Sequence, residues 1–197
     1  MSPEERAREH IDEQLEAAGW KVQDRLVIDL GAGTGVAVRE FTLDTGEADY
    51  VLFVDRKACG VIEAKPEGVT LSGVADQTGR YQSGVPDVLP THERGIRFAY
   101  ESTGVETFFR DQRDKDTRSR RVFSFHTPET LRGWLAESDT LRTRLKAMPP
   151  LLKPGLRGCQ VEAITNLEKS FADTRPRALI QMASGGGKTF TAVTFSY

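Results

Sequence analysis

Cysteine is scarce in this sequence, with only Cys59 and Cys159 among 197 residues. Two cysteines are too few for a disulfide framework or a zinc site, as is usual for proteins of the reducing cytoplasm. The chain also lacks any run near the ~18 consecutive apolar residues that would suggest a membrane span. Its acidic beginning lacks the apolar core of a signal peptide. We therefore expect a cytoplasmic protein without a membrane partner.

An excess of charge of one sign is also missing. The formal net charge is −2, which argues against wholesale coating of nucleic acid but leaves room for a local basic groove. Hydrophobic residues make up 38% and charged residues 28%, a composition typical of globular proteins. The composition therefore limits the class of protein and leaves its chemistry open.

Apolar periodicity predicts a mixed α/β chain. Ser2-Pro3-Glu4-Glu5 is a good helix start, with a capping serine, then proline at the first helical position. Apolar residues recur at helical spacing from there until Gly19. The turn Arg56-Lys57 separates two stretches typical of strands, residues 50–54 and 60–64. The other expected elements are strands over 36–43, 97–100, 107–109 and 122–125, and helices over 72–82 and from Thr127.

The clearest boundary in the chain lies at residues 148–155. Three prolines and a glycine in these eight residues cannot continue a helix or a central strand. A second pattern begins beyond them, with an apolar-periodic helix, a short strand over 178–182 and a glycine-rich run. We therefore expect a domain over residues 1–147, a linker over 148–156 and a second, partial domain over 157–197.

A glycine-rich run at residues 27–35 resembles the first motif of S-adenosylmethionine-dependent methyltransferases. In that family the motif lies between a strand and a helix. Residues 36–43 instead alternate like a strand, and no βαβ unit follows. We therefore expect a loop that leads into a strand, and we reject the methyltransferase interpretation.

Residues 110–121 are dense in both charge signs. We expect a solvated loop here. Contact with a DNA backbone is the alternative, because the segment is net basic. The arginines that favour this alternative are Arg113, Arg118, Arg120 and Arg121.

Three charged residues stand at the open end of the predicted hairpin. Asp49 begins its first strand, and Glu63 and Lys65 lie near the end of its second strand, on one face. Two carboxylates can bind Mg²⁺, which polarises a phosphate and acidifies a bound water. Lys65 could orient that water or neutralise charge on phosphorus. Ordinary solvent-facing charges are the alternative, and the otherwise apolar second strand argues against it.

Residues 46–52, 60–65 and 77–81, read together, resemble the N-terminal nuclease domain of type I restriction endonuclease R (motor) subunits. The resemblance spans nearly all of residues 1–145 and implies the PD-(D/E)xK restriction-endonuclease-like fold, an α/β fold whose central mixed sheet is flanked by helices. It implies that Asp49 and Glu63 bind Mg²⁺ and that Lys65 is catalytic. Gln77 and Tyr81, one helical turn apart, would position the DNA backbone or the active site, although packing in the core is the alternative.

Related nucleases also place an acidic residue on the first helix near the metal. Glu5 is the candidate here, and its capping role at the helix start explains it equally well.

The glycine-rich run Ala183-Ser184-Gly185-Gly186-Gly187-Lys188-Thr189 resembles the phosphate-binding loop of superfamily 2 helicases, one residue short of the usual spacing. Backbone N–H groups of Gly185, Gly186 and Gly187 would face phosphate oxygens. The resemblance implies that Lys188 contacts the β- and γ-phosphates, that Thr189 holds Mg²⁺ and that Gln160, in a Q motif, reads the base of ATP.

These motifs imply the beginning of a RecA-like domain. Its acidic metal-binding motif, arginine finger and second lobe would lie past residue 197. We therefore expect a truncated motor that does not hydrolyse ATP.

The leading hypothesis is a metal-dependent endonuclease module that cuts double-stranded DNA. Its partners would be the modification (methyltransferase) and specificity subunits of a type I restriction complex. One alternative is a nuclease-helicase of DNA repair or defence without modification partners. Another is a DNA-binding assembly module with a vestigial nuclease site.

Overall fold

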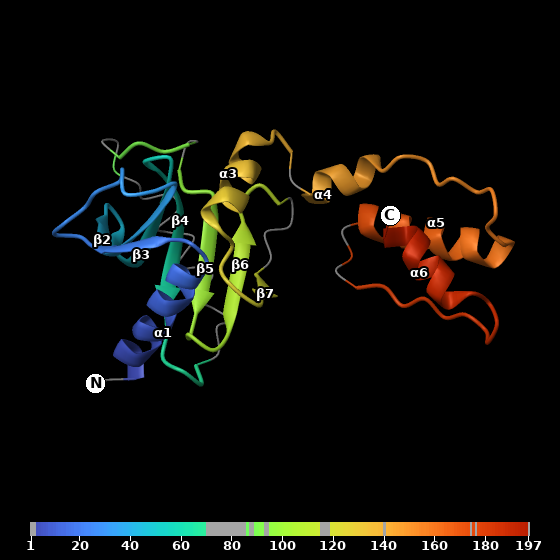
Figure 1. Cartoon of the computed structure of the whole chain (residues 1–197), viewed down its shortest axis with the longest axis horizontal. Helices are drawn as coiled ribbons and strands as arrows, with labels where there is room; N and C mark the ends of the chain where they lie inside the picture. Colours follow the sequence, from blue (N-terminus) through green and yellow to red (C-terminus); the bar gives the residue numbers. More distant parts are fainter. Residues whose placement is uncertain are drawn as a thin grey trace. The chain divides into compact units, whose positions relative to one another are not determined.

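The chain folds into two compact units, Met1–Ser138 and Asp139–Tyr197 (Figure 1). The computed structural model describes residues 3–69, 86, 89–92, 95–114, 119–139, 141–173, 175 and 177–196. The boundary predicted at residue 147 and the linker predicted over 148–156 both fall within the second unit. The helix predicted over 72–82 lies outside the described residues. In the ranges given above, no helix is long and apolar enough to cross a bilayer.

A seven-stranded mixed sheet forms the centre of the first unit, with its strands in the order β1 to β7. The β1–β2 and β4–β5 pairs are parallel and the remaining pairs are antiparallel. The mixed α/β prediction is thereby confirmed. The strands are β1 (Lys21–Asp24), β2 (Gly35–Leu43), β3 (Gly46–Val54), β4 (Lys57–Ala64), β5 (Phe98–Ser102), β6 (Thr107–Asp111) and β7 (Arg120–Val122).

The predicted hairpin is formed by β3 and β4. Its turn residues Asp55 and Arg56 have φ values of 48° and 66°. Positive φ at both central residues is typical of a two-residue type I′ turn, whose twist matches that of the strands. The turn therefore lies one residue earlier than predicted, and Lys57 already belongs to β4.

Helices α1 (Pro3–Ala17) and α3 (Pro128–Ala136) pack on one face of the sheet (Figure 1). Ile11 and Leu15 of α1 and Leu131 of α3 are fully buried there against Tyr50 and Ile62. The α3 start is as predicted, because the Thr127 side chain accepts a hydrogen bond from the Thr130 N–H. The second face carries a separate apolar cluster. Its sheet residues include Val36, Val38, Val51, Phe53, Val61 and Ala99.

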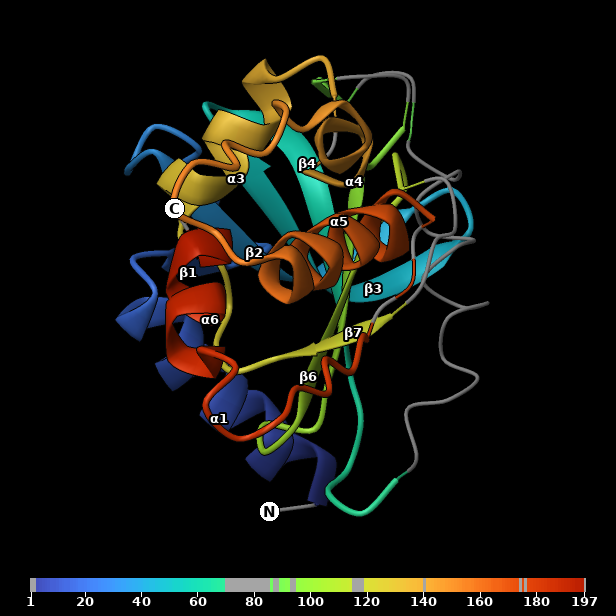
Figure 2. The ribbon, with the colours of Figure 1, turned by 90° about the vertical axis from the view of Figure 1, so that its right-hand side faces the viewer.

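The second unit is helical in its described part. Its elements are α4 (Leu141–Arg144), the short 3-10 helix η1 (Leu145–Ala147), α5 (Gly158–Ala172) and α6 (Lys188–Ser196). Both ribbon views place α5 and α6 side by side (Figure 2). The rings of Phe171 and Phe195 pack between these helices, with centroids 5.6 Å apart.

Two strand predictions are wrong. Residues 178–182 form no strand, because a strand needs hydrogen-bonding neighbours and the described residues of this unit offer none. The strand expected over 122–125 is β7, which ends at Val122 and leaves Phe123 exposed.

Candidate active site

The β3–β4 hairpin brings Asp49, Glu63 and Lys65 together, as the sequence predicts. Asp49 Oδ2 accepts a hydrogen bond of 2.9 Å from the backbone N–H of Ala64. Lys65 Nζ lies 2.6 Å from Glu63 Oε1. The Asp49 and Glu63 side chains are only 10% and 5% exposed, whereas that of Lys65 is 24% exposed. Two nearly buried carboxylates thus share one end of the hairpin with a partly exposed ammonium group.

Burial and neighbouring charges alter the acid–base behaviour of this group. Burial raises the pKa of Glu63, the hydrogen bond from Lys65 opposes this rise in part, and the negative charge of Asp49 adds to it, so that pKa stays raised. Burial lowers the pKa of Lys65, but its hydrogen bond and attraction to Glu63 and the charge of Asp49 leave that pKa raised. The two carboxylates are therefore in electrostatic contact, and Lys65 is held in its cationic form.

The donor set at this end of the hairpin suits a hard divalent cation. Mg²⁺ is usually held by one or two carboxylates, with waters and substrate phosphate in its other positions. Asp49 and Glu63 supply two such groups. Within the described ranges, no cluster of three or more His, Cys, Asp or Glu side chains is placed to hold a metal ion. These two carboxylates are the groups at this end of the hairpin that could hold a Mg²⁺ ion, with waters or phosphate oxygens in its other positions.

Helix α1 contributes residues that sequence reasoning missed. The Arg8 guanidinium donates from Nη2 to Asp49 Oδ1 and from Nη1, at 3.2 Å, to Glu40 Oε1. Glu4 Oε1 lies 3.8 Å from Arg8 Nη2, and its charge raises the pKa of both Glu63 and Lys65. No sequence pattern signals these contacts, because Arg8 and Asp49 are 41 residues apart.

Glu40 stands opposite Asp49 in the β2–β3 pair, between the partners Arg39↔Tyr50 and Phe41↔Ala48. Its φ of 50° lies in the left-handed region, which costs a residue with a side chain about 1–2 kcal/mol. Strained backbone of this kind is frequent at functional sites.

Of the remaining predicted residues of this site, the structure describes Glu5 but not Gln77 or Tyr81. Glu5 is on the first turn of α1 and is exposed. Its neighbour Glu4 is the α1 carboxylate whose charge acts on Glu63 and Lys65. Gln77 and Tyr81 lie outside the described residues.

The glycine-rich run at residues 27–35 has a structural role. It is a loop that continues into β2 at Gly35, which confirms the predicted loop leading into a strand. A Cβ on Gly35 would lie 2.3 Å from Pro128 Cγ and 2.9 Å from Trp20 Cε3. Gly35 therefore permits close packing of β2 against the start of α3.

The arginines of the 110–121 segment that the structure describes have acceptors within the first unit. Arg110 bonds buried Glu101 at 3.1 Å, and Arg113 donates to the Glu137 carbonyl at 2.6 Å. Arg120 and Arg121 pair with Asp114 and Glu106 at 3.5 and 3.2 Å. Arg118 lies outside the described residues. Residues 110 and 111 belong to β6 and residues 120 and 121 to β7, so the solvated loop predicted over 110–121 is wrong at both of its ends.

In the second unit, the predicted nucleotide-binding residues surround one turn. Residues Gly185, Gly186 and Gly187 form the turn, and Lys188 and Thr189 begin α6. The amide of Gln160 on α5 donates to the Gly187 carbonyl at 3.3 Å and accepts from the Arg157 backbone N–H at 2.9 Å. Arg157 also donates to the Gly185 carbonyl at 3.0 Å. The Q-motif glutamine and the glycine-rich turn are therefore adjacent in this fold.

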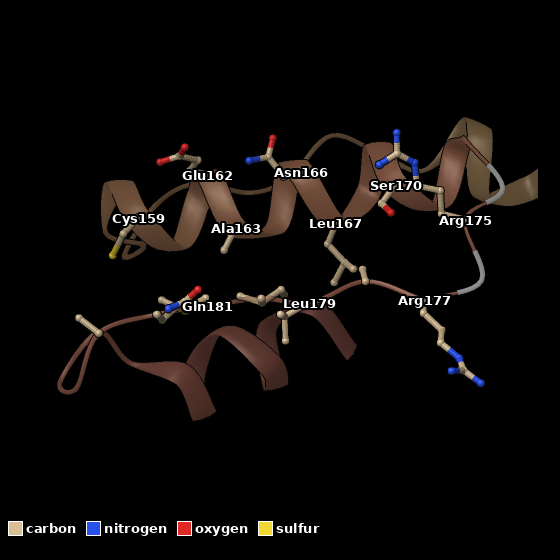
Figure 3. A pocket seen from close by; sticks show the side chains of 15 residues that line it. Cys159, Glu162, Ala163, Asn166, Leu167, Ser170, Arg175, Arg177, Leu179 and Gln181 are labelled. Carbon is tan, nitrogen blue, oxygen red and sulfur yellow. The ribbon is translucent and has the colours of Figure 1, made fainter.

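A cavity of about 630 Å³ lies between α5 and the extended segment 177–183 (Figure 3). Ala163 and Leu167 of α5 point toward Leu179 and Gln181 across it. Among the described residues, its lining includes Gly186 of the glycine-rich turn but not Gln160, Lys188 or Thr189. The cavity borders the predicted nucleotide site without containing its key side chains.

Comparison with known proteins shows which proteins this chain resembles. Residues 30–103 match the model of the second domain of the type I restriction enzyme EcoKI endonuclease subunit. The EcoKI endonuclease subunit of Escherichia coli (strain K12) is 28% identical over 245 aligned positions, which cover 98% of this chain. The chain is related to type I restriction enzyme R subunits. Residues 153–197 of this chain also match the family model of the res subunit of type III restriction enzymes.

A solved structure shares the fold of this chain. It is a fragment described as an HsdR subunit of a type I restriction enzyme from Vibrio vulnificus YJ016, 22% identical with a TM-score of 0.52. The match covers all of this chain and 37% of that one. The chain spans 21% of the EcoKI subunit. The predicted resemblance to type I R subunits is thereby confirmed, for a part of their length.

Proposed function

We propose that this chain is the metal-dependent DNA endonuclease module of a type I restriction R subunit. The first unit would have the PD-(D/E)xK restriction-endonuclease-like fold and cut double-stranded DNA. The observation that carries the proposal is the convergence of Asp49, Glu63 and Lys65 at one end of the hairpin, with Lys65 2.6 Å from Glu63. The relation to the EcoKI endonuclease subunit supports it.

In this proposal Asp49 and Glu63 hold a Mg²⁺ ion, which would polarise the scissile phosphate and lower the pKa of a bound water. The Ala64 N–H fixes the Asp49 carboxylate through Oδ2, so that carboxylate is preorganised. Lys65, kept cationic by Glu63, neutralises charge that develops on the phosphate oxygens. Gln77 and Tyr81 would position the DNA backbone, and Glu5 is the first-helix metal ligand proposed from sequence.

The second unit is proposed to begin a RecA-like ATP-driven motor. Lys188 and Thr189 would hold the phosphates of ATP and their Mg²⁺, with Gln160 on the base. The adjacency of Gln160 to the Gly187 carbonyl, at 3.3 Å, supports this assignment. In the whole protein the motor would act together with modification and specificity subunits of a type I complex.

A plasmid cleavage assay tests the nuclease proposal. The full-length protein containing this chain is supplied with its partner subunits, ATP and Mg²⁺, and is compared with Asp49→Ala and Lys65→Ala. Both variants should lose DNA cleavage while ATP hydrolysis continues, because their side chains serve the first unit alone. Cleavage by either variant at the unaltered rate would refute the assigned site.

A further inference from the structure

We propose that Arg8 is an electrostatic guard on Asp49: its guanidinium occupies the carboxylate oxygen that a divalent cation would use, and loading of the cation transfers the guanidinium to Glu4 and Glu40. This inference rests on the proposed metal site and concerns how that site is regulated. It requires that Arg8 and the cation compete, and that Arg8 has other acceptors within reach.

The competition follows from the contacts of Asp49. Its Oδ2 faces the Ala64 N–H, and its Oδ1 faces the Arg8 Nη2. A Mg²⁺ ion binds a carboxylate oxygen at about 2.0–2.1 Å. A guanidinium in hydrogen-bond contact with the same oxygen occupies one of its two lone pairs, and its positive charge repels the incoming cation. Loading of the metal at Asp49 is therefore favoured when the guanidinium moves away from Oδ1.

Alternative acceptors for Arg8 are already in place. Its Nη1 lies 3.2 Å from Glu40 Oε1, and its Nη2 lies 3.8 Å from Glu4 Oε1. The side chains of Glu4 and Glu40 are 50% and 44% exposed, so both can adjust their rotamers. Within the described chain the Arg8 Nε has no hydrogen-bond partner, so the guanidinium can gain a bond by rotating.

The charge balance also favours an exchange. Glu4, Glu40, Asp49 and Glu63 surround the two cations Arg8 and Lys65. When ionised, these side chains carry a net charge of two negative units, which a divalent cation neutralises. Without a metal ion, Arg8 is the cation that relieves repulsion at Asp49. After metal binding, the freed guanidinium remains paired with the two glutamates.

Binding of Mn²⁺ alone, followed by electron paramagnetic resonance or calorimetry, tests this inference without any measurement of cleavage. Arg8→Gln should bind Mn²⁺ about tenfold more tightly than the unaltered protein, a typical size for coupling between two binding events. Arg8→Lys, which keeps the charge, should bind Mn²⁺ less tightly than Arg8→Gln. Arg132→Gln is the matched control, because Arg132 forms an ion pair with Asp55, outside this group of charges, and it should leave Mn²⁺ affinity unchanged.

If folded Arg8→Gln binds Mn²⁺ as tightly as the unaltered protein or less tightly, the inference is overturned. Less tight binding would mean that Arg8 orients Asp49 for the metal ion. Asp49→Asn separates this result from failure of the proposed function. If Asp49→Asn abolishes Mn²⁺ binding while Arg8→Gln has no effect, the proposed metal site is supported and the proposed competition by Arg8 is refuted. If Asp49→Asn binds Mn²⁺ as the unaltered protein does, the metal site itself is refuted, and the guard with it.

Discussion

A buried ion pair between Arg97, just before β5, and Asp111, the last residue of β6, permits a quantitative test of the fold that supports the site. Arg97 and Asp111 have side chains only 3% and 7% exposed, and they form two hydrogen bonds of 2.9 and 2.8 Å. Arg97 also donates to the Trp134 carbonyl of α3 at 2.6 Å. Asp111 accepts a further hydrogen bond of 3.0 Å from the Arg113 backbone N–H.

Asp111→Ala should lower the free energy of unfolding of the first unit by about 3–5 kcal/mol, because it leaves a buried guanidinium without its carboxylate. The double variant Arg97→Met/Asp111→Leu should recover most of the loss, since apolar groups of similar volume avoid the cost of burying charge. The contrast between these two variants distinguishes an unpaired charge from a general loss of packing.

Urea denaturation followed by tryptophan fluorescence measures this free energy. The chain has two tryptophans, and Trp20 and Trp134 both lie in the first unit. Both belong to or pack against its core, so their emission reports on that unit alone. A loss below about 1 kcal/mol for Asp111→Ala, the level of an exposed ion pair, would refute the reasoning.

Four further predictions concern other parts of the first unit. Burial lowers the pKa of His126 to about 4 in the folded protein. As the pH falls from about 6.5 to 4, the unfolded chain therefore binds a proton at His126 that the folded protein does not bind, and the free energy of unfolding should fall. After allowance for partial exposure the loss is about 2 kcal/mol, and His126→Gln should remove it in pH-dependent urea titrations. Gly35→Ala should cost about 1–3 kcal/mol or prevent folding, because its Cβ would clash with Pro128. Gly133→Ala, with open space around its Cβ in α3, should raise the free energy of unfolding by about 0.5–1 kcal/mol in the same urea denaturation. Glu4→Gln should lower the pKa of Glu63, measured by carboxyl NMR, and Glu5→Gln should lower it less.

The elements that local sequence determines were predictable. Helix α1, the β3–β4 hairpin and the capped start of α3 depend on periodicity and turn chemistry within a few residues. Strand β1 was missed because its four residues, Lys21–Asp24, are largely polar and pair only with β2, in parallel. The strand predicted over 178–182 failed because its apolar composition does not provide the neighbours that a strand requires.

The candidate site was predictable in part for the same reason. Asp49, Glu63 and Lys65 meet because a short hairpin sets their register, and alternation places two of them on one face. Arg8 and Glu4 reach the site only after α1 packs across the sheet. That packing depends on the buried Ile11 and Leu15, whose partners lie far along the chain. Tertiary packing of this kind leaves no local pattern.

The anchoring of α1 decides which movement the proposed exchange of Arg8 can use. Asp12 accepts two hydrogen bonds from Arg39, at 3.1 and 2.6 Å, and one from the Tyr50 hydroxyl at 2.9 Å. The same hydroxyl lies 3.2 Å from the Arg8 carbonyl. Burial raises the pKa of Tyr50 strongly, so this hydroxyl remains a donor at physiological pH. Because the backbone of Arg8 is tied to β3 in this way, the guanidinium can leave Asp49 by rotation of its own side chain, and the helix that carries Glu4 stays in place to receive it.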